Sequence, residues 1–199
     1  MKSTSWLRRL SGIYIGRPLA AIGIKREQVI VLRIVLGVLT ALALAIGPSW
    51  FATGAALFLV GLFFERSDGE FSRISGQIDQ AGDRFALITY GATNALAFIG
   101  LGIGLRNGIY GLWEIPMGLF AAAGLAVLPW LVKRLETIDG KRSAEFDGIA
   151  GIDADDLLFI VPVALWAGYA EGLLMLTAFG GTLFVGALYM THFRKFQLK

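Results

Sequence analysis

Apolar residues gather in six runs along the chain, and short polar segments separate the runs. They cover residues 28–46, 50–64, 85–105, 112–131, 157–169 with its flanks, and 173–190. A helix rises about 1.5 Å per residue and a bilayer's hydrocarbon core is about 30 Å thick, so runs of roughly this length predict membrane-spanning helices. The pattern predicts an all-α integral membrane protein with six transmembrane helices.

The residues before the first run follow another pattern. Between residues 6 and 22, apolar side chains alternate with Arg8, Arg9 and Arg17, which is typical of an amphipathic helix in the membrane interface. A small-residue cleavage pattern is missing, so we interpret this stretch as a retained anchor. Since the longest loop has about two dozen residues, we expect one membrane domain over residues 1–199, with an interfacial segment at about 1–24 and a six-helix core at about 25–196.

Composition and charge agree with this fold. The chain is 56% hydrophobic and 17% charged, and its mean hydropathy is +0.67. Lysine and arginine gather at the termini and in alternate loops, whereas the opposite loops contain only Arg106. The positive-inside rule therefore places both termini and the segment 65–84 in the cytoplasm, at the cytoplasmic membrane if the source is bacterial. Topology and anionic lipid explain the net charge of +3, so no nucleic-acid partner is expected.

Four carboxylates lie between the second and third runs, at Glu65, Asp68, Asp79 and Asp83. The first two are three residues apart and the last two four apart, so on helices each pair shares a face. One pair would leave the second helix and the other would enter the third. Such a cluster could hold a divalent cation, or it could simply pair with Arg66, Arg73 and Arg84 in a solvated loop.

The choice of metal is limited by composition. The chain has no cysteine, and its only histidine is His192, so zinc and haem sites are not expected and an oxygen-ligand site for Mg²⁺, Mn²⁺ or Ca²⁺ remains. Two divalent ions would neutralise four carboxylates and leave positions for phosphate oxygens, as phosphoryl transfer requires. Gly69 would let a substrate approach the backbone, and Arg73 could contact a phosphate.

These residues resemble the signature of the CDP-alcohol phosphotransferase (CDP-alcohol phosphatidyltransferase) family, D-x2-D-G-x2-A-R-x8-G-x3-D-x3-D. Asp68-Gly69, Arg73 and the closing pair Asp79 and Asp83 match in order. Glu65 replaces the first aspartate and Ser72 the alanine. Five residues separate Arg73 from Asp79, seven fewer than in the signature. The six runs, the amphipathic N-terminal segment and the chain length are also similar to compact family members.

The resemblance implies a phospholipid-synthesis enzyme that uses a CDP-linked donor, usually CDP-diacylglycerol, and an acceptor alcohol, and that releases CMP. It implies two Mg²⁺ or Mn²⁺ ions on the four carboxylates, with Asp83 as the base that deprotonates the acceptor hydroxyl. It also implies a homodimer and a CDP site formed by Asp68, Gly69, Ser72 and Arg73. A catalytically silent relative that serves as a membrane partner or scaffold is the alternative, followed by a transporter.

Other polar residues have two interpretations each. Lys133, Arg134, Lys141 and Arg142 are candidates for binding a phosphate on the acceptor, although positive-inside anchoring also explains them. Arg33 lies inside the first run, where we expect its side chain to extend to the interface, with a role facing the acidic cluster as the alternative. Asn94, deeper in the third run, is expected to join helices.

Overall fold

The computed structural model describes residues 26–75, 80–139 and 154–197, together with Tyr14, Pro18 and Ile24. These residues contain helices and turns and no strand. The interfacial segment expected at residues 6–22 lies outside the described residues, apart from Tyr14 and Pro18. In chain order the elements are α3 (Arg26–Ile46), η2 (Pro48–Trp50), α4 (Phe51–Ser75), α5 (Gln80–Gly104), η3 (Gly111–Trp113), α6 (Glu114–Asp139), η5 (Ala154–Phe159), α7 (Ile160–Trp166), α8 (Ala170–Met175), η6 (Leu176–Gly181) and α9 (Thr182–Gln197).

Five helical segments of the described chain are long and apolar enough to cross a membrane. They cover Arg26–Ile46, Pro48–Ser67, Arg84–Gly104, Gly111–Arg134 and Ala170–Met190. Each coincides with one of the apolar runs, so the predicted all-helical class, with several helices apolar enough to span a membrane, is confirmed. The remaining run, at 157–169, corresponds to a shorter apolar helix at Leu157–Trp166.

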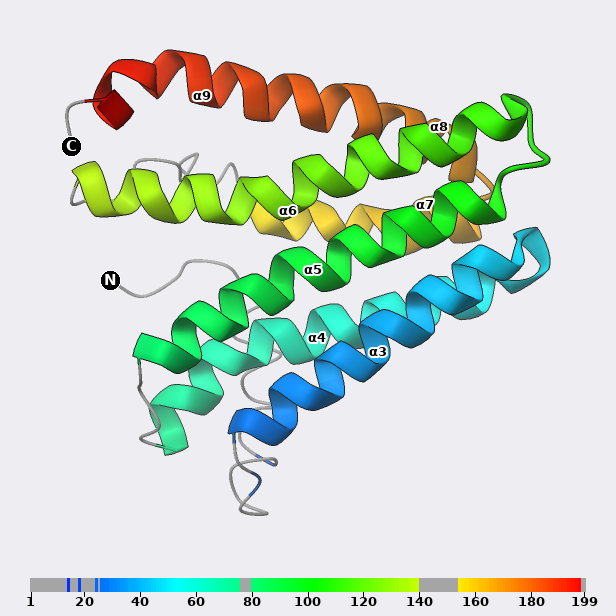
Figure 1. Ribbon diagram of the computed structural model, residues 1–199. Helices are drawn as coiled ribbons and strands as arrows, with labels where there is room; N and C mark the ends of the chain where they lie inside the picture. The colour runs from blue at the N-terminus through cyan, green and yellow to red at the C-terminus, as the bar shows by residue number, and fades with distance from the viewer. Residues whose placement is uncertain are drawn as a thin grey trace.

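The helices run back and forth between the two ends of an elongated bundle (Figure 1). The α3–α4, α5–α6 and α7–α8 connections lie at one end, which we call the turn end. The first turn of α3, the last turn of α4, the first turn of α5 and the last turns of α6 and α9 lie at the other, which we call the charged end. The chain therefore returns across the bundle between α6 and α8, and η5 with α7 makes this return. The return ends at Gly168, whose φ of 79° favours glycine.

Helix α5 is wedged between α3 and α6, and it approaches both closely through glycine. A Cβ on Gly100 would contact the backbone carbonyl of Ala41 in α3. On another face of α5, a Cβ on Gly102 would lie 2.5 Å from the Glu114 carbonyl oxygen and 2.9 Å from the Gly118 Cα in α6. Such backbone contacts are the packing that helices use in lipid, where small residues give close dispersion contact. Position and tilt of α5 are thus fixed on both sides.

The buried apolar core fills the middle of this bundle. It includes Leu44 on α3, Phe58 and Leu62 on α4, and Phe98 and Leu101 on α5, each no more than 6% exposed. Residues from α6, α7 and α8 extend the same cluster toward the turn end. The core therefore anchors the α3–α4–α5 group whose charged end carries the acidic segment.

Candidate functional site

The α4–α5 hairpin carries the acidic segment at the charged end of the bundle. Helix α4 continues past its apolar part to Ser75, so Glu65 and Asp68 are both helical and three residues apart. Helix α5 begins at Gln80, which places Asp83 in its first turn. Figure 1 shows these two helix ends next to each other. The backbone therefore agrees with the predicted arrangement, in which one carboxylate pair leaves a helix and Asp83 enters the next.

The side chains of the predicted motif are described only in part. Glu65 is described, but Asp79 lies outside the described residues. For the other motif residues the structure gives the helical backbone and not the side chain; these are Asp68, Gly69, Ser72, Arg73 and Asp83. Their convergence on a metal or on CDP therefore stays a prediction.

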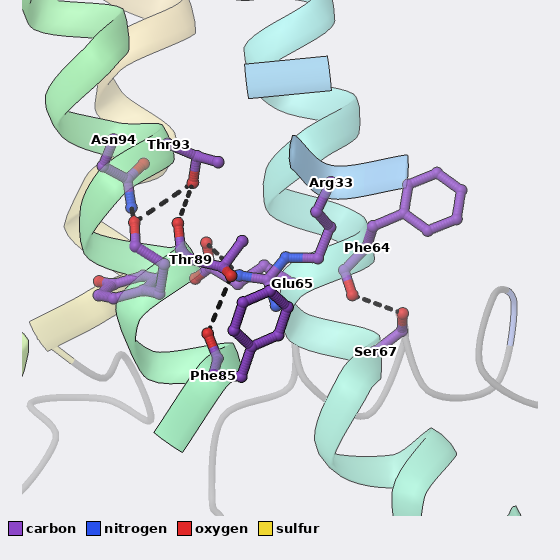
Figure 2. A network of polar contacts seen from close by, with 9 residues as sticks. Arg33, Phe64, Glu65, Ser67, Phe85, Thr89, Thr93 and Asn94 are labelled. Carbon is purple, nitrogen blue, oxygen red and sulfur yellow. Dashed lines mark hydrogen bonds and ion pairs between the residues drawn. The ribbon is translucent and has the colours of Figure 1, made fainter. Parts of the chain in front are cut away.

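The Glu65 carboxylate forms an ion pair with Arg33 of α3. Arg33 Nη2 lies 3.7 Å from Glu65 Oε2, and the side chains are 4% and 13% exposed, respectively. Figure 2 shows the Arg33 side chain extending from α3 toward Glu65 on α4. The expectation that Arg33 extends to the lipid interface is wrong, because its guanidinium lies between helices and faces a carboxylate. The alternative role, facing the acidic segment, matches this geometry.

Two further arginines are buried near this end. Arg26 in the first turn of α3 is 7% exposed, and Arg66, next to Glu65 on α4, is 4% exposed. Removing a guanidinium from water is costly unless anions or hydrogen-bond acceptors compensate it. Among the described residues, the charged end thus contains three buried arginines, Arg26, Arg33 and Arg66, together with the Glu65 carboxylate. Charge of this kind within a membrane protein usually marks a functional site.

A small cavity with several polar groups in a mainly apolar wall adjoins the Arg33–Glu65 pair. Its volume is about 20 Å³, large enough for a water molecule. Its polar lining comes from Arg33, Thr40, Glu65, Thr93 and Asn94, and apolar residues of α3 and α4 complete the wall. Thr40 is 1% exposed and Asn94 3% exposed, so the polar groups lie inside the protein and do not face lipid.

Side chains of α5 on this side of the bundle are hydrogen-bonded to their own helix. Thr89 Oγ1 donates to the Phe85 carbonyl at 2.8 Å, and Thr93 Oγ1 donates to the Thr89 carbonyl at 2.9 Å. Asn94 Nδ2 donates to the Tyr90 carbonyl at 2.9 Å (Figure 2). This bond lies within α5, so it does not join two helices as the sequence led us to expect. Hydropathy contained no signal for Thr89 and Thr93, because a single hydroxyl changes it little.

The candidate acceptor residues lie at the same end, on α6. Lys133 and Arg134 are exposed near the end of that helix, and the Arg134 guanidinium lies 5.2 Å from the ring centroid of Trp130. Lys141 and Arg142 lie outside the described residues. Figure 1 places the end of α6 at the charged end, together with the starts of α3 and α5. Lys133 and Arg134 therefore lie at the charged end of the bundle, whereas Arg106 lies at the turn end.

The turn end contains a carboxylate pair that the sequence did not reveal. Glu114, which is fully buried, accepts a hydrogen bond from the Tyr110 backbone N–H through Oε1 at 3.1 Å. Glu171 Oε1 accepts one from the Ile109 N–H at 3.1 Å. Both oxygens flank Gly108, since a Cβ there would lie 2.7 Å from Glu114 Oε1 and 2.5 Å from Glu171 Oε1. The pair fastens the α5–α6 turn to α6 and α8.

These features define a helical membrane-embedded protein with buried arginines and an acidic helical hairpin at one end. In comparisons with known proteins, the chain matches no family model and no curated protein.

Proposed function

We propose that the protein is a metal-dependent CDP-alcohol phosphotransferase whose active site lies at the charged end of the bundle. It transfers a phosphatidyl group, or a related phospho-alcohol group, from a CDP-linked donor, CDP-diacylglycerol in the first instance, to an acceptor alcohol. The observation that carries the proposal is the largely buried Glu65 carboxylate, which lies 3.7 Å from Arg33 Nη2 where α4 leaves its apolar part. Asp68, Gly69, Ser72 and Arg73 follow on that helix, and Asp83 lies in the first turn of α5.

The proposal includes a membrane arrangement. The η5–α7 return forms a sixth crossing, the N-terminal segment lies in the cytoplasmic interface, and two copies pair through their membrane helices. The charged end then faces the cytoplasm, where CDP-linked lipids meet soluble alcohols. The clustering of charge at one end favours an interfacial transferase over a transporter, which would place its polar groups near mid-membrane between broken helices.

The donor atoms fit Mg²⁺ or Mn²⁺. Glu65, Asp68, Asp79 and Asp83 supply only carboxylate oxygens, which are the ligands that these ions prefer. Glu65 is close to Arg33 but is not locked to it, because a 3.7 Å contact is longer than a hydrogen bond and Arg33 Nη2 donates none among the described residues. When bound, two ions would neutralise the carboxylates and the donor diphosphate.

The protein's own groups then have separate tasks. Asp68, Gly69, Ser72 and Arg73 line the CDP moiety, and Gly69 lets the diphosphate approach the α4 backbone. Asp83 accepts the proton of the acceptor hydroxyl. The hydroxyl oxygen forms a new bond to the β-phosphorus while the bond between that phosphorus and the CMP phosphate breaks, so CMP leaves.

Acceptor selection belongs to the cationic groups of the α6 end. Lys133 and Arg134, with Lys141 and Arg142 in the following segment, bind a phosphate on an acceptor such as glycerol phosphate or inositol phosphate. A polyanionic acceptor would gain from several cations close to the membrane surface, as lipid headgroups do.

The test is CMP release from CDP-diacylglycerol by purified protein in lipid, with Mg²⁺ or Mn²⁺ and a panel of acceptor alcohols. We expect metal-dependent release that one acceptor stimulates and that Asp83→Asn abolishes. Glu27→Gln is the matched control, because Glu27 is an exposed carboxylate of the first α3 turn outside the motif. Folded protein that releases no CMP with any acceptor would contradict the proposal and favour the silent relative.

A further inference from the structure

We infer that Arg33 is the built-in counter-ion of Glu65, competing with the divalent cation for this carboxylate. The inference rests on the proposed function, since it concerns the metal expected at Glu65. Arg33 lies seven residues after Arg26 on the buried face of α3, about two helical turns further into the bundle. It is thus a positioning residue and not a group that contacts the reacting atoms.

Burial makes the pairing necessary. A guanidinium that is 4% exposed within a membrane-embedded bundle is costly without a nearby anion, and a largely buried carboxylate is costly without a nearby cation. The Arg33–Glu65 pair satisfies both requirements when no metal is present. Arg26 and Arg66 are buried at the same end and are the same in every Arg33 variant, so a difference between these variants reports on Arg33.

The length of the contact makes the pairing exchangeable. Strong arginine–carboxylate pairs form two parallel hydrogen bonds at about 2.7–2.9 Å. Here the two charged atoms are 3.7 Å apart, and Arg33 Nη2 is buried without a hydrogen bond among the described residues. The attraction is therefore mainly that of two charges, which a divalent ion can replace.

The polar groups in the wall of the cavity give the guanidinium alternative partners. Arg33 itself lines the cavity, and so do Thr40 from α3 and Thr93 and Asn94 from α5. Asn94 uses its Nδ2 for the Tyr90 carbonyl, so its amide oxygen can accept a hydrogen bond. When a metal takes the Glu65 carboxylate, we expect the Arg33 side chain to turn toward these oxygens.

The sign of the effect separates this role from a structural one. If Arg33 only shaped the site, its replacement would weaken metal binding. If it competes for Glu65, Arg33→Gln tightens Mn²⁺ binding, because a unit charge about 4 Å from the carboxylate is removed. We expect about tenfold tighter binding or more. Arg33→Lys keeps the charge and should bind Mn²⁺ within about threefold of the wild type.

The experiment is Mn²⁺ titration of the full chain in lipid nanodiscs, followed by electron paramagnetic resonance of free Mn²⁺. The proteins are the wild type, Arg33→Gln, Arg33→Lys and, as the ligand-loss control, Glu65→Gln. Tighter binding in Arg33→Gln with near-wild-type binding in Arg33→Lys supports the inference. Equal or weaker binding in Arg33→Gln, with Mn²⁺ still bound by the wild type, overturns the counter-ion role and leaves the proposed function standing.

A second measurement tests the inference even if Arg33→Gln is less stable than the wild type. Arg33→Gln leaves Glu65 without this cation, so in metal-free buffer the variant should unfold at a lower temperature than the wild type. Because a ligand that binds only the folded state stabilises it, Mn²⁺ should then raise the Tm of Arg33→Gln more than that of the wild type. A smaller or equal rise overturns the inference. Absence of Mn²⁺ binding in every protein overturns the metal site of the proposed function as well.

Discussion

Gly100→Ala tests how closely α3 and α5 approach each other. The new Cβ would contact the carbonyl oxygen of Ala41 and lie 2.9 Å from its carbonyl carbon and from its Cα. All three atoms belong to the backbone, so no side-chain rotation can relieve the contact. The two helices must separate, and α5 cannot shift far the other way because Gly102 lies against the α6 backbone.

The magnitude follows from the size of that separation. Carbon atoms pack best at about 3.5–4.0 Å, so the helices must part by about 0.5–1 Å, a gap that loses a quarter to a half of the local dispersion energy. Overpacking of this kind costs about 1–3 kcal/mol. The cost of a backbone clash lies at the upper end of this range, and the higher helix propensity of alanine offsets about 1 kcal/mol of that cost. We expect a net loss of about 2 kcal/mol in the free energy of unfolding, a factor of about 30 in the folded-to-unfolded ratio.

The assay is equilibrium unfolding in mixed micelles of lipid and detergent, followed by tryptophan fluorescence. Gly186→Ala is the matched control, because a Cβ at that α9 position meets no atom within 4 Å. The control should be as stable as the wild type or slightly more stable. If Gly100→Ala and Gly186→Ala have the same free energy of unfolding, the backbone contact between α3 and α5 is not as close as described and the reasoning is refuted.

Two further predictions concern the turn end and the orientation of the bundle. Glu114→Gln should raise the free energy of unfolding by about 1–2 kcal/mol. The glutamine keeps an acceptor for the Tyr110 N–H and removes a buried charge beside Glu171. A lower Tm in thermal unfolding would contradict this prediction. Because the chain has no cysteine, a single introduced cysteine reports on which side of the membrane its position lies. Ile109→Cys should react with an impermeant maleimide added outside intact cells, whereas Arg134→Cys should react only after permeabilisation. The reverse result would exclude a cytoplasmic charged end.

The long helices could be predicted because charged or turn residues bound the apolar runs. The first predicted run and α3 both end at Ile46, before Gly47 and Pro48. Hydropathy records contact with lipid and not helix formation, however. Helix α4 therefore continues eleven residues past the run that ends at Phe64, since an established helix extends readily into polar residues.

The fifth run shows a different limit. Its residues are apolar as far as Tyr169, but the helix ends at Trp166 and the chain turns at Gly168 with a positive φ. A glycine in an apolar run is compatible with helix, with a turn and with close packing, so composition could not choose between them. Packing of the bundle determines the turn, since the chain must reverse there to form α8 and α9.

The candidate site was predictable in sequence position and not in contacts. The acidic segment falls at the helix ends that the spacing indicated, but the direction of Arg33 was predicted wrongly. A signal existed, because Arg26 and Arg33 are seven residues apart and so share the α3 face that also buries Val29 and Ile30. No such signal links Glu114 with Glu171, which only the folded chain brings to the same turn.

The two kinds of polar residue in this bundle have a consequence for biogenesis. Thr89, Thr93 and Asn94 donate to carbonyls of their own helix, so α5 can enter the lipid as a self-contained segment. Arg33 finds its counter-ion on the next helix, so α3 reaches a neutral state in the membrane only when Glu65 arrives with α4. The first two helices should therefore leave the translocon as one hairpin, and α5 should follow alone.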